Sequence, residues 1–315
     1  MTHRVSLRVV AVLLLGGMLT SECGGSQDAS TPTAPSTTTP TRDTWTAESG
    51  VRIANVTSSS TIRLTDNTYR TYYGGVRTAT SIDGLGWGGF SDPIRPTAGA
   101  QNRNPAIFRT SDGTYVLIFE QVVSNVGRFY RASSPDGVTF AIDPSTPVME
   151  PTGSDNGFLS VPDVIGDTAL SVRMYFVAGG SLVESATSSD AGRTWIREGR
   201  IAVNGLSAAN WIVDPDMIRT NTGGYSLFFA TGPDGQGGLS SKRIRSATST
   251  DGRTFTLEAG NCLTPLASGD DLVDPDVVHS ADGRYRMYYG YATAGKQYQL
   301  VSAVSSLASC AQHSP

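Results

Sequence analysis

The sequence repeats one pattern every 50 to 60 residues or so, and this repeat most limits the folds open to the chain. In each copy, β-forming residues lead into a turn, usually Asp-Gly, and return through an aromatic residue. The aromatic residues are Trp87, Phe140, Trp195 and Phe255. Another aromatic strand-like run, such as "TYVLIFEQ", precedes each turn. Each unit therefore predicts about four short strands, the sequence signature of a propeller blade.

The number of blades follows from the two ends of the repeat region. Four units are complete, and a fifth begins at Asp274 but ends after "VSAVSSLASC" (301–310), without its last strand. The missing piece matches the other end of the chain, because "TWTAESG" (44–50) resembles "TFTLEAG" (254–260). An outer strand supplied from there would leave no open sheet edge. We predict an all-β, five-bladed β-propeller over residues 43–315, with its last blade closed by the N-terminal strand.

Residues before the repeats predict export rather than folding. Two arginines precede an apolar run (9–19) that is too short to span a bilayer, which is the pattern of a secretory signal over residues 1–23. "LTSECGGS" resembles a bacterial lipoprotein cleavage site, which implies acylation of Cys23. Residues 24–42 form a Ser/Thr/Pro linker with nothing to bury. We expect an exported, monomeric protein in the cell envelope that reaches the membrane only through this lipid anchor.

Composition excludes several kinds of chemistry. The net charge of −4 provides no basic footprint, so nucleic acid is not an expected partner. Among three histidines, His279 alone lies within the repeats, and a multi-histidine zinc site cannot be built. Any hydrolysis must therefore use carboxylates, tyrosines or arginines. Cys262 and Cys310 remain in an exported chain and predict a disulfide, with two buried thiols as the alternative.

Four units begin with a proline that sets a common register. The residues directly before it are Asn104, Val161, Asp214 and Asp274, and those directly after it are Ala106, Asp163, Asp216 and Asp276. In the first unit, Ser58 and Ser60 take these places. Because the first strand of each blade lines the channel, Asp214 and Asp274 should meet at its mouth. Proline suits this place because it fixes φ and needs no donor at a strand start.

The segments "DPDMIRTNTGGYSLFFATG" and "DPDVVHSADGRYRMYYGYA" resemble the inner strands of five-bladed glycosidases of families 43 and 32. This resemblance implies glycan hydrolysis, with Asp214 and Asp274 each serving as base or nucleophile, or holding the acid. Those families also place a catalytic Glu at the start of another blade, and no blade here has one. Glu120, near the end of a second strand, is the candidate proton donor, with an ion pair or a solvated carboxylate as its alternative roles.

A second resemblance concerns sialidases. "SSDAGRTW" (188–195) is similar to their Asp box, and "RNPAIFRTSDGTYVLIFE" (103–120) is similar to their Arg-Ile-Pro strand. It implies that Arg103 binds a substrate carboxylate, a role that suits guanidinium geometry.

Other substrate-binding candidates are Asn104 and Asp163 at the channel and Trp211, whose ring could stack on a sugar or simply pack. Asp163, Asp216 and Asp276 could instead hold strands, or bind a structural calcium ion through oxygen ligands. No other cofactor is expected.

Three functions remain open at this stage. The leading hypothesis is an exported glycan-active propeller, a glycoside hydrolase that uses the aspartates at the channel mouth. The first alternative is a non-catalytic propeller that binds a glycan or a protein, because a fold alone does not fix an activity. The second alternative is a sialidase-like hydrolase. A proton donor within reach of Asp214 and Asp274 would favour an enzyme.

Overall fold

The computed structural model describes residues 45–96, 98–166, 171–180, 182–206, 211–232 and 241–311. The expected signal segment, Cys23 and the linker lie outside these ranges. Residues from Thr41 onward cluster as one compact unit. In the part of the chain that is described, no helix is long and apolar enough to cross a membrane.

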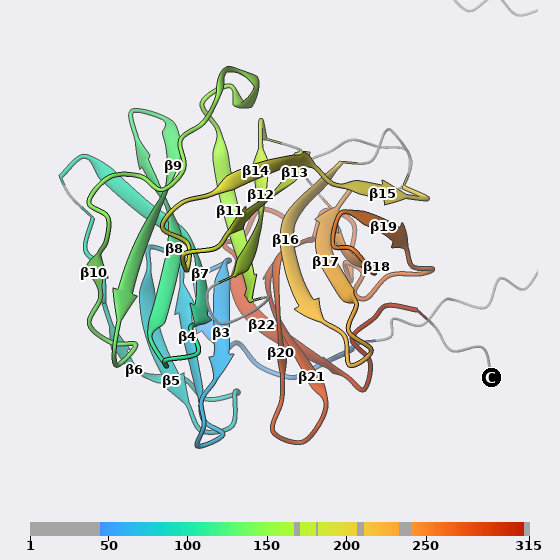
Figure 1. Cartoon of the computed structure of the whole chain (residues 1–315). Coiled ribbons are helices and arrows are strands. Elements are labelled where there is room, and N and C mark those ends of the chain that lie inside the picture. Colours follow the sequence, from blue (N-terminus) through green and yellow to red (C-terminus); the bar gives the residue numbers. More distant parts are fainter. Residues whose placement is uncertain are drawn as a thin grey trace, which may run out of the picture. The chain divides into compact units, whose positions relative to one another are not determined.

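The described strands form a five-bladed β-propeller (Figure 1). Blade 1 contains β3 (Ser59–Arg63), β4 (Tyr69–Tyr73), β5 (Arg77–Ser81) and β6 (Gly88–Ser91); blade 2 contains β7 (Ala100–Arg109), β8 (Tyr115–Val123), β9 (Val126–Ser134) and β10 (Ala141–Ile142); blade 3 contains β11 (Leu159–Gly166), β12 (Val172–Ala178), β13 (Leu182–Ser188) and β14 (Ile196–Arg200). Blade 4 contains β16 (Ile212–Arg219), β17 (Tyr225–Thr231), β18 (Arg243–Ser249) and β19 (Thr254–Leu257); blade 5 contains β20 (Asp271–His279), β21 (Tyr285–Ala292), β22 (Gln299–Ser305), β1 (Thr46–Ala47) and β2 (Ile53–Ala54). The inner strands β3, β7, β11, β16 and β20 contact one another around the ring.

The last blade is completed by the N-terminal strand, which confirms the closure predicted from the sequence. Thr46 in β1 is paired with Val304 in β22, in antiparallel register. The amide of Glu48 donates to the carbonyl of Ser302 at 2.8 Å. The Glu48 carboxylate also pairs with the guanidinium of Arg286 at 2.8 Å. Blade 5 thus combines both ends of the propeller.

One strand was not predicted. The chain leaving blade 3 forms β15 (Ala202–Asn204), which pairs in parallel with β19 on the outside of blade 4. An outer strand presents unpaired amides and carbonyls, and a passing segment can satisfy them. The repeat pattern carries no sign of β15, because this segment belongs to a connection between blades.

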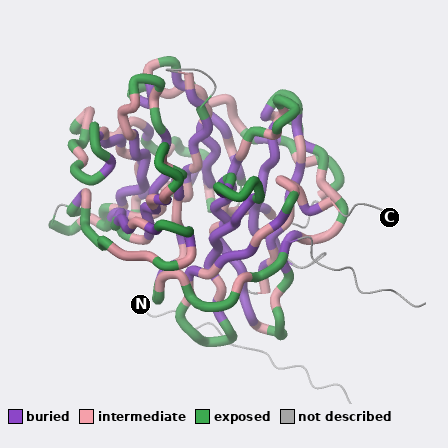
Figure 2. Tube along the Cα trace, turned by 90° about the horizontal axis from the view of Figure 1, so that it is seen from below, coloured by how far each residue is buried: buried purple, intermediate pink, exposed green. Residues whose placement is uncertain are grey.

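Apolar residues fill the spaces between neighbouring blades, with one cluster at each of the five interfaces in the described chain. Buried residues run along the strands, and exposed residues collect in the loops (Figure 2). Aromatic residues near the repeated turns pack edge-on against the second strand of an adjacent blade. These pairs are Phe140 with Tyr72, Trp87 with Tyr288, and Phe255 with Tyr175. The aromatic residue of each repeat therefore joins blades as well as marking a turn.

The Asp-Gly turns make a second contact between blades. Arg286 Nη1 donates to the carbonyl of Asp83 at 2.8 Å, and the Tyr288 hydroxyl donates to the carbonyl of Gly84 at 2.9 Å. The same Arg-x-Tyr arrangement on β4 and β12 binds the turns at residues 136–137 and 251–252. A Cβ atom on Gly84 would lie 2.4 Å from Arg286 Nη1, and its φ is +75°. Glycine is required here because both the turn and the approaching guanidinium exclude a side chain.

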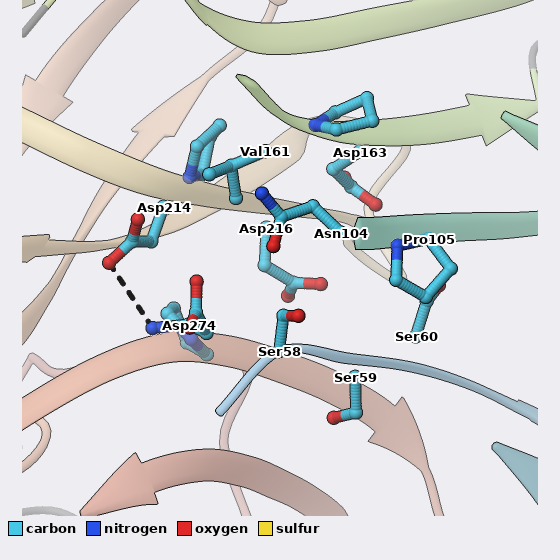
Figure 3. Close-up of a pocket in the computed structure, with 13 residues that line it drawn as sticks. Ser58, Ser59, Ser60, Asn104, Pro105, Val161, Asp163, Asp214, Asp216 and Asp274 are labelled. Carbon is cyan, nitrogen blue, oxygen red and sulfur yellow. Dashed lines mark hydrogen bonds between the residues drawn. The ribbon is translucent and has the colours of Figure 1, made fainter. Parts of the chain in front are cut away.

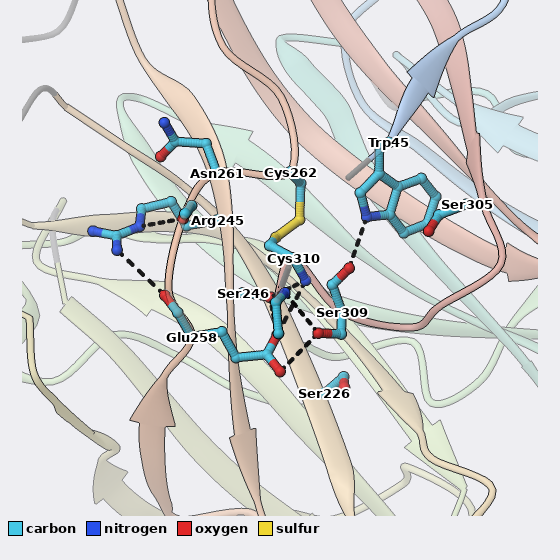
Figure 4. Close-up of a disulfide and its surroundings, with 12 residues drawn as sticks. Trp45, Ser226, Arg245, Ser246, Glu258, Asn261, Cys262, Ser305, Ser309 and Cys310 are labelled. Atoms are coloured by element: carbon cyan, nitrogen blue, oxygen red, sulfur yellow. Dashed lines mark hydrogen bonds between the residues drawn. A yellow bond between two sulfur atoms is a disulfide. The ribbon is translucent and has the colours of Figure 1, made fainter. Parts of the chain in front are cut away.

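A disulfide joins the C-terminal segment to the end of blade 4 (Figure 4). Cys262 and Cys310 have Cα atoms 4.6 Å apart, within the range that such a bond needs. The Cys310 amide donates to Ser246 Oγ at 2.9 Å, and the indole of Trp45 donates to the carbonyl of Ser309 at 3.2 Å. The chain that follows β22 is therefore tied both to blade 4 and to the strand that closes the ring.

We expect removal of this disulfide to lower the stability of the closed ring. The Cys262→Ser, Cys310→Ser double variant should lose about 2 to 4 kcal/mol of unfolding free energy, because the unfolded chain is no longer cross-linked. Urea unfolding of the variant and of the wild type, each with and without a reductant, measures this loss. Reductant should destabilise the wild type alone. An equal unfolding midpoint in all four samples would contradict the expectation.

Candidate functional site

The inner strands change direction at the residue that precedes the proline. Asn104, Val161, Asp214 and Asp274 have φ values of 48°, 49°, 54° and 49°, and the strand register shifts at each of them. Such values are rare for residues other than glycine and cost energy, above all for a β-branched residue such as Val161. A bulge of this kind re-aims one side chain. In four blades, the bulge therefore turns the residue before the proline toward the channel.

Asp214 and Asp274 line a pocket of about 320 Å³ at the channel mouth. Its lining residues come from blades 3, 4 and 5 and from Thr57, which directly precedes blade 1; they include Phe158, Ser160, Trp211, Asp214, Lys242, Asp274 and Tyr298. Two carboxyl groups, three aromatic side chains and one amine thus share one pocket. Pockets that bind small ligands have this character, largely apolar with a few placed polar groups.

Asp214 and Asp274 both line this pocket. Figure 3 shows them side by side among the residues of the adjoining narrow channel. One carboxylate oxygen of Asp214 accepts a hydrogen bond from the backbone amide of Asp274 at 3.3 Å. Burial raises the pKa of Asp214 to about 6, although Lys242 and the Asp274 amide oppose the change. Burial and the Asp214 charge raise the pKa of Asp274 well above its ordinary value. The charge of Asp214 thus opposes ionisation of Asp274, and the pair resists carrying two negative charges.

A buried ion pair forms one wall of the pocket. Lys242 Nζ lies 2.5 Å from Asp271 Oδ2, and the Tyr298 hydroxyl donates to the same oxygen at 2.6 Å. Burial and the hydrogen bond to Asp271 raise the pKa of Tyr298, so the phenol stays protonated. Lys242 places one positive charge beside Asp214 and Asp274. Its ion pair with Asp271 fixes the amine in place, and this limits how far Lys242 can neutralise the two pocket acids.

The aspartates that directly follow the proline bind neighbouring inner strands. Each accepts a hydrogen bond from a backbone amide of the next inner strand: Asp163 from Met217 at 2.8 Å, Asp216 from Val277 at 3.1 Å, and Asp276 from Thr61 at 3.1 Å. In blade 1, Ser60 Oγ does the same for Ile107 at 3.0 Å. Blade 2 has Ala106 at this position and no side chain to accept. Side chains at this one register position therefore link four of the five pairs of neighbouring inner strands.

Asp163, Asp216 and Ser60 line a narrow cavity of about 20 Å³, room for roughly one water molecule. Burial raises the pKa of Asp163 to about 7, and the charge of Asp276 adds to the effect. Over the described ranges, no three His, Cys, Asp or Glu side chains gather in a way that could hold a metal ion. The suggestion of calcium at Asp163, Asp216 and Asp276 therefore gains no support. Their oxygens are directed to backbone amides of neighbouring strands instead.

Glu120, the candidate proton donor, lies behind the pocket rather than in its lining. Its side chain is 1% exposed. It accepts hydrogen bonds from Asn104 Nδ2 at 2.7 Å and from the hydroxyl of Ser160, and Ser160 lines the pocket. Arg103 Nε is 3.9 Å from the carboxylate, but the Arg103 side chain is 43% exposed. Burial raises the pKa of Glu120 above its ordinary value despite these partners.

The predicted substrate-binding residues lie in two adjoining cavities and in the narrow channel. Trp211 lines the pocket of Asp214 and Asp274, as its position before β16 suggested. Arg103 and Asn104 line an adjoining cavity of about 590 Å³, and both cavities reach Thr57. Asn104 also lines the narrow channel, together with Asp163. The structure thus brings Asp214, Asp274 and Trp211 into one pocket and leaves Arg103 outside it.

Sequence reasoning missed several lining residues, among them Phe158, Ser160, Lys242 and Tyr298. Ser160 could have been found, because it stands two residues before Pro162, as Val213 stands before Pro215. That register position also contributes Val213 and Val273 to the lining. Lys242 and Tyr298 directly precede the third strands of their blades, β18 and β22, where the repeats differ and give no signal.

No family model matches the chain, and no curated protein matches it either. Solved structures do match in fold. An N-acetylgalactosamine deacetylase from F. plautii, in complex with blood group B trisaccharide, is 14% identical over 83% of this chain and 95% of its own, with a TM-score of 0.64. An endo-arabinase from Bacteroides thetaiotaomicron is 14% identical over 82% and 98%, with a TM-score of 0.61. A GH32 beta-fructofuranosidase from Bombyx mori is 12% identical over 83% and 61%, with a TM-score of 0.61. The chain therefore has the fold of glycosidase-type five-bladed propellers, as the inner-strand resemblance predicted.

The pKa of Asp163 predicts how stability changes with pH. Its folded-state pKa of about 7 lies above the ordinary value of 3.8, so its contribution to stability is full below pH 3.8 and is lost as the pH rises through 7. Asp163→Asn should therefore reduce the loss of unfolding free energy between pH 5 and pH 8, because a neutral amide can still accept from Met217. Urea unfolding at the two pH values measures this. Asp282→Asn, at an exposed turn, is the control and should keep the wild-type slope; the same slope for Asp163→Asn would contradict the prediction.

Proposed function

We propose that this protein binds a glycan at the mouth of the propeller channel and hydrolyses it with Asp214 and Asp274. One observation carries the proposal: two adjacent acids share a 320 Å³ pocket with Phe158 and Trp211. Aromatic faces suit the apolar faces of sugar rings, and carboxyl groups suit the chemistry of the glycosidic bond. The glycosidases of the same fold add support, since their inner strands meet in the same architecture.

The two acids divide the work according to their ionisation. Asp214 is a carboxylate at neutral pH, since its pKa is about 6. It either attacks the anomeric carbon or takes a proton from the attacking water. Asp274, whose pKa is raised well above its ordinary value, forms a hydrogen bond with the sugar or with that water. Lys242 steadies the negative charge that remains on Asp214, because its amine lines the same pocket.

The location of the protein stays a proposal that rests on its first 42 residues. We infer that the propeller acts outside the cytoplasm and is tethered to the cell envelope through acylated Cys23. Fractionation of cells that make the Cys23→Ser variant tests this inference. The tether is wrong if the variant stays in the membrane fraction as the wild type does.

Glycan binding without hydrolysis is the second candidate, and a specific observation favours it. Of the described residues that line the pocket, Asp214 and Asp274 carry the two carboxyl groups, and they are neighbours. Glycoside hydrolysis needs two groups that flank the bond. The sialidase hypothesis has less support, because no arginine belongs to the described lining and Arg103 opens on the adjoining cavity.

Substitution of the two pocket acids tests the proposal. Asp214→Asn and Asp274→Asn should each lower hydrolysis by a factor of about 10² or more, since each removes a group that acts on the reacting atoms. A screen of aryl glycosides and polysaccharides first identifies a substrate for the wild type. Thermal unfolding should change little, and Asp282→Asn should keep full activity.

The outcomes separate the two candidates. Glycan binding in an array, with no hydrolysis by the wild type, would assign the pocket to a binding module. Full activity in both Asn variants would place the reaction elsewhere in the molecule. Unfolding of both variants would make the aspartates structural and remove the basis of the proposal.

A further inference from the structure

A hydrolytic pocket also needs a source of the proton that the leaving group takes up. Asp214 and Asp274 adjoin each other on blades 4 and 5, so both approach the sugar from neighbouring directions. A glycosidic oxygen must be protonated as it departs, and the donor must stand across the bond from the attacking group. Blade 3 lies on the other side of blade 4 from blade 5. Its polar contribution to the pocket is Ser160.

Ser160 belongs to a closed polar cluster that extends below the pocket. Its Oγ atom contacts Glu120 Oε2 and accepts from Asn104 Nδ2 at 3.0 Å. The same Asn104 amide donates to Glu120 Oε2 at 2.7 Å. Asn104 is held in place by the bulge that precedes Pro105, where its φ is 48°. The cluster therefore connects a buried carboxyl group to a hydroxyl at the pocket surface.

We propose that Glu120 is the proton source for the leaving group and that its proton passes through the hydroxyl of Ser160. This inference rests on the proposed hydrolytic function and supplies a donor on the blade 3 side of the pocket. Ser160 touches the substrate, whereas Glu120 acts through it.

The transfer balances without any further reactant. Protonated Glu120 donates its O–H to Ser160 Oγ, which leaves the hydroxyl hydrogen of Ser160 free to point into the pocket. As the glycosidic C–O bond breaks, Ser160 gives that hydrogen to the departing oxygen and takes the proton of Glu120. Glu120 becomes a carboxylate, and Ser160 ends as a neutral hydroxyl. After the products leave, Asp214 loses to solvent the proton that it took from the attacking water, and Glu120 regains a proton from solvent through Ser160.

The surroundings of Glu120 favour the protonated form that this step needs. Gly127 packs on the carboxyl, since a Cβ atom there would lie 3.2 Å from Glu120 Oε1 and 2.5 Å from the carbonyl of Leu159. The charged group that faces Glu120 in the described structure is Arg103 of β7, at 3.9 Å and partly exposed. From β11, the hydroxyl of Ser160 and the amide of Val161 face it. Burial outweighs these partners and raises its pKa.

Leaving-group dependence distinguishes the relay from a structural ion pair. Glu120→Gln and Ser160→Ala should each slow hydrolysis of alkyl glycosides or natural oligosaccharides by about 10² to 10⁴-fold, because their leaving groups need a proton. Hydrolysis of dinitrophenyl glycosides should change little, because that leaving group departs without one. The fall of kcat/KM at high pH, which reports the essential acid, should also disappear in Glu120→Gln.

The chain offers a matched control in the pair of Glu48 and Ser302. Ser302 Oγ donates to Glu48 Oε2 at 2.7 Å in blade 5, away from the lining of the pocket. Glu48→Gln and Ser302→Ala should alter the unfolding temperature without changing the leaving-group dependence. Equal losses on activated and unactivated substrates in Glu120→Gln and Ser160→Ala would overturn the relay and make the cluster structural.

The relay and the proposed function fail in different ways. Unchanged rates and an unchanged pH profile in both relay variants, with an active wild type, would overturn the relay and leave the hydrolytic function standing. A wild type that hydrolyses no glycoside, activated or not, would overturn both together.

Discussion

Hydrogen bonds from backbone amides to side chains of the preceding blade hold the inner strands of this propeller in one ring. Asp163, Asp216, Asp276 and Ser60 make these joints, and all stand at the same register position. A carboxylate in so narrow a channel is costly to bury unless it is bonded. Here the acids are bonded to strands whose amides would otherwise lack a partner. Channel width and blade spacing both depend on this arrangement.

The three residues Asp-Pro-Asp therefore have two roles: they link neighbouring blades, and they place an acid in the pocket. The second acid binds the next blade, and the proline lies where a bulge interrupts the sheet pairing. The first acid, placed in the left-handed region by that bulge, is turned toward the pocket. Its position is fixed by backbone conformation, so Asp214 and Asp274 need little reorganisation to meet a ligand. Preorganised polar groups of this kind are what a catalytic or binding site requires.

The fold and the positions of Asp214 and Asp274 could be predicted because they repeat. Turn aromatics recur with each blade, and one proline sets a common register. What does not repeat was missed: β15 lies in a connection, and Lys242 and Tyr298 lie just before the third strands of their blades, where the repeats differ. Glu120 was recognised as a candidate acid, but no sequence pattern could show that Ser160 stands between it and the pocket. That contact depends on two blades meeting, which is a property of the folded ring.

The closing strand has a consequence for how the protein is made. Glu48 accepts a hydrogen bond from Ser302, 254 positions later in the chain. Ribosomes build chains from the N-terminus, so β1 is synthesised long before its partner β22 exists. Blades 1 to 4 can pair their own strands as they emerge, whereas blade 5 must wait for the last segment. Until then β1 carries exposed pairing groups and Trp45, and a chaperone or the emerging chain itself must keep this strand from other edges.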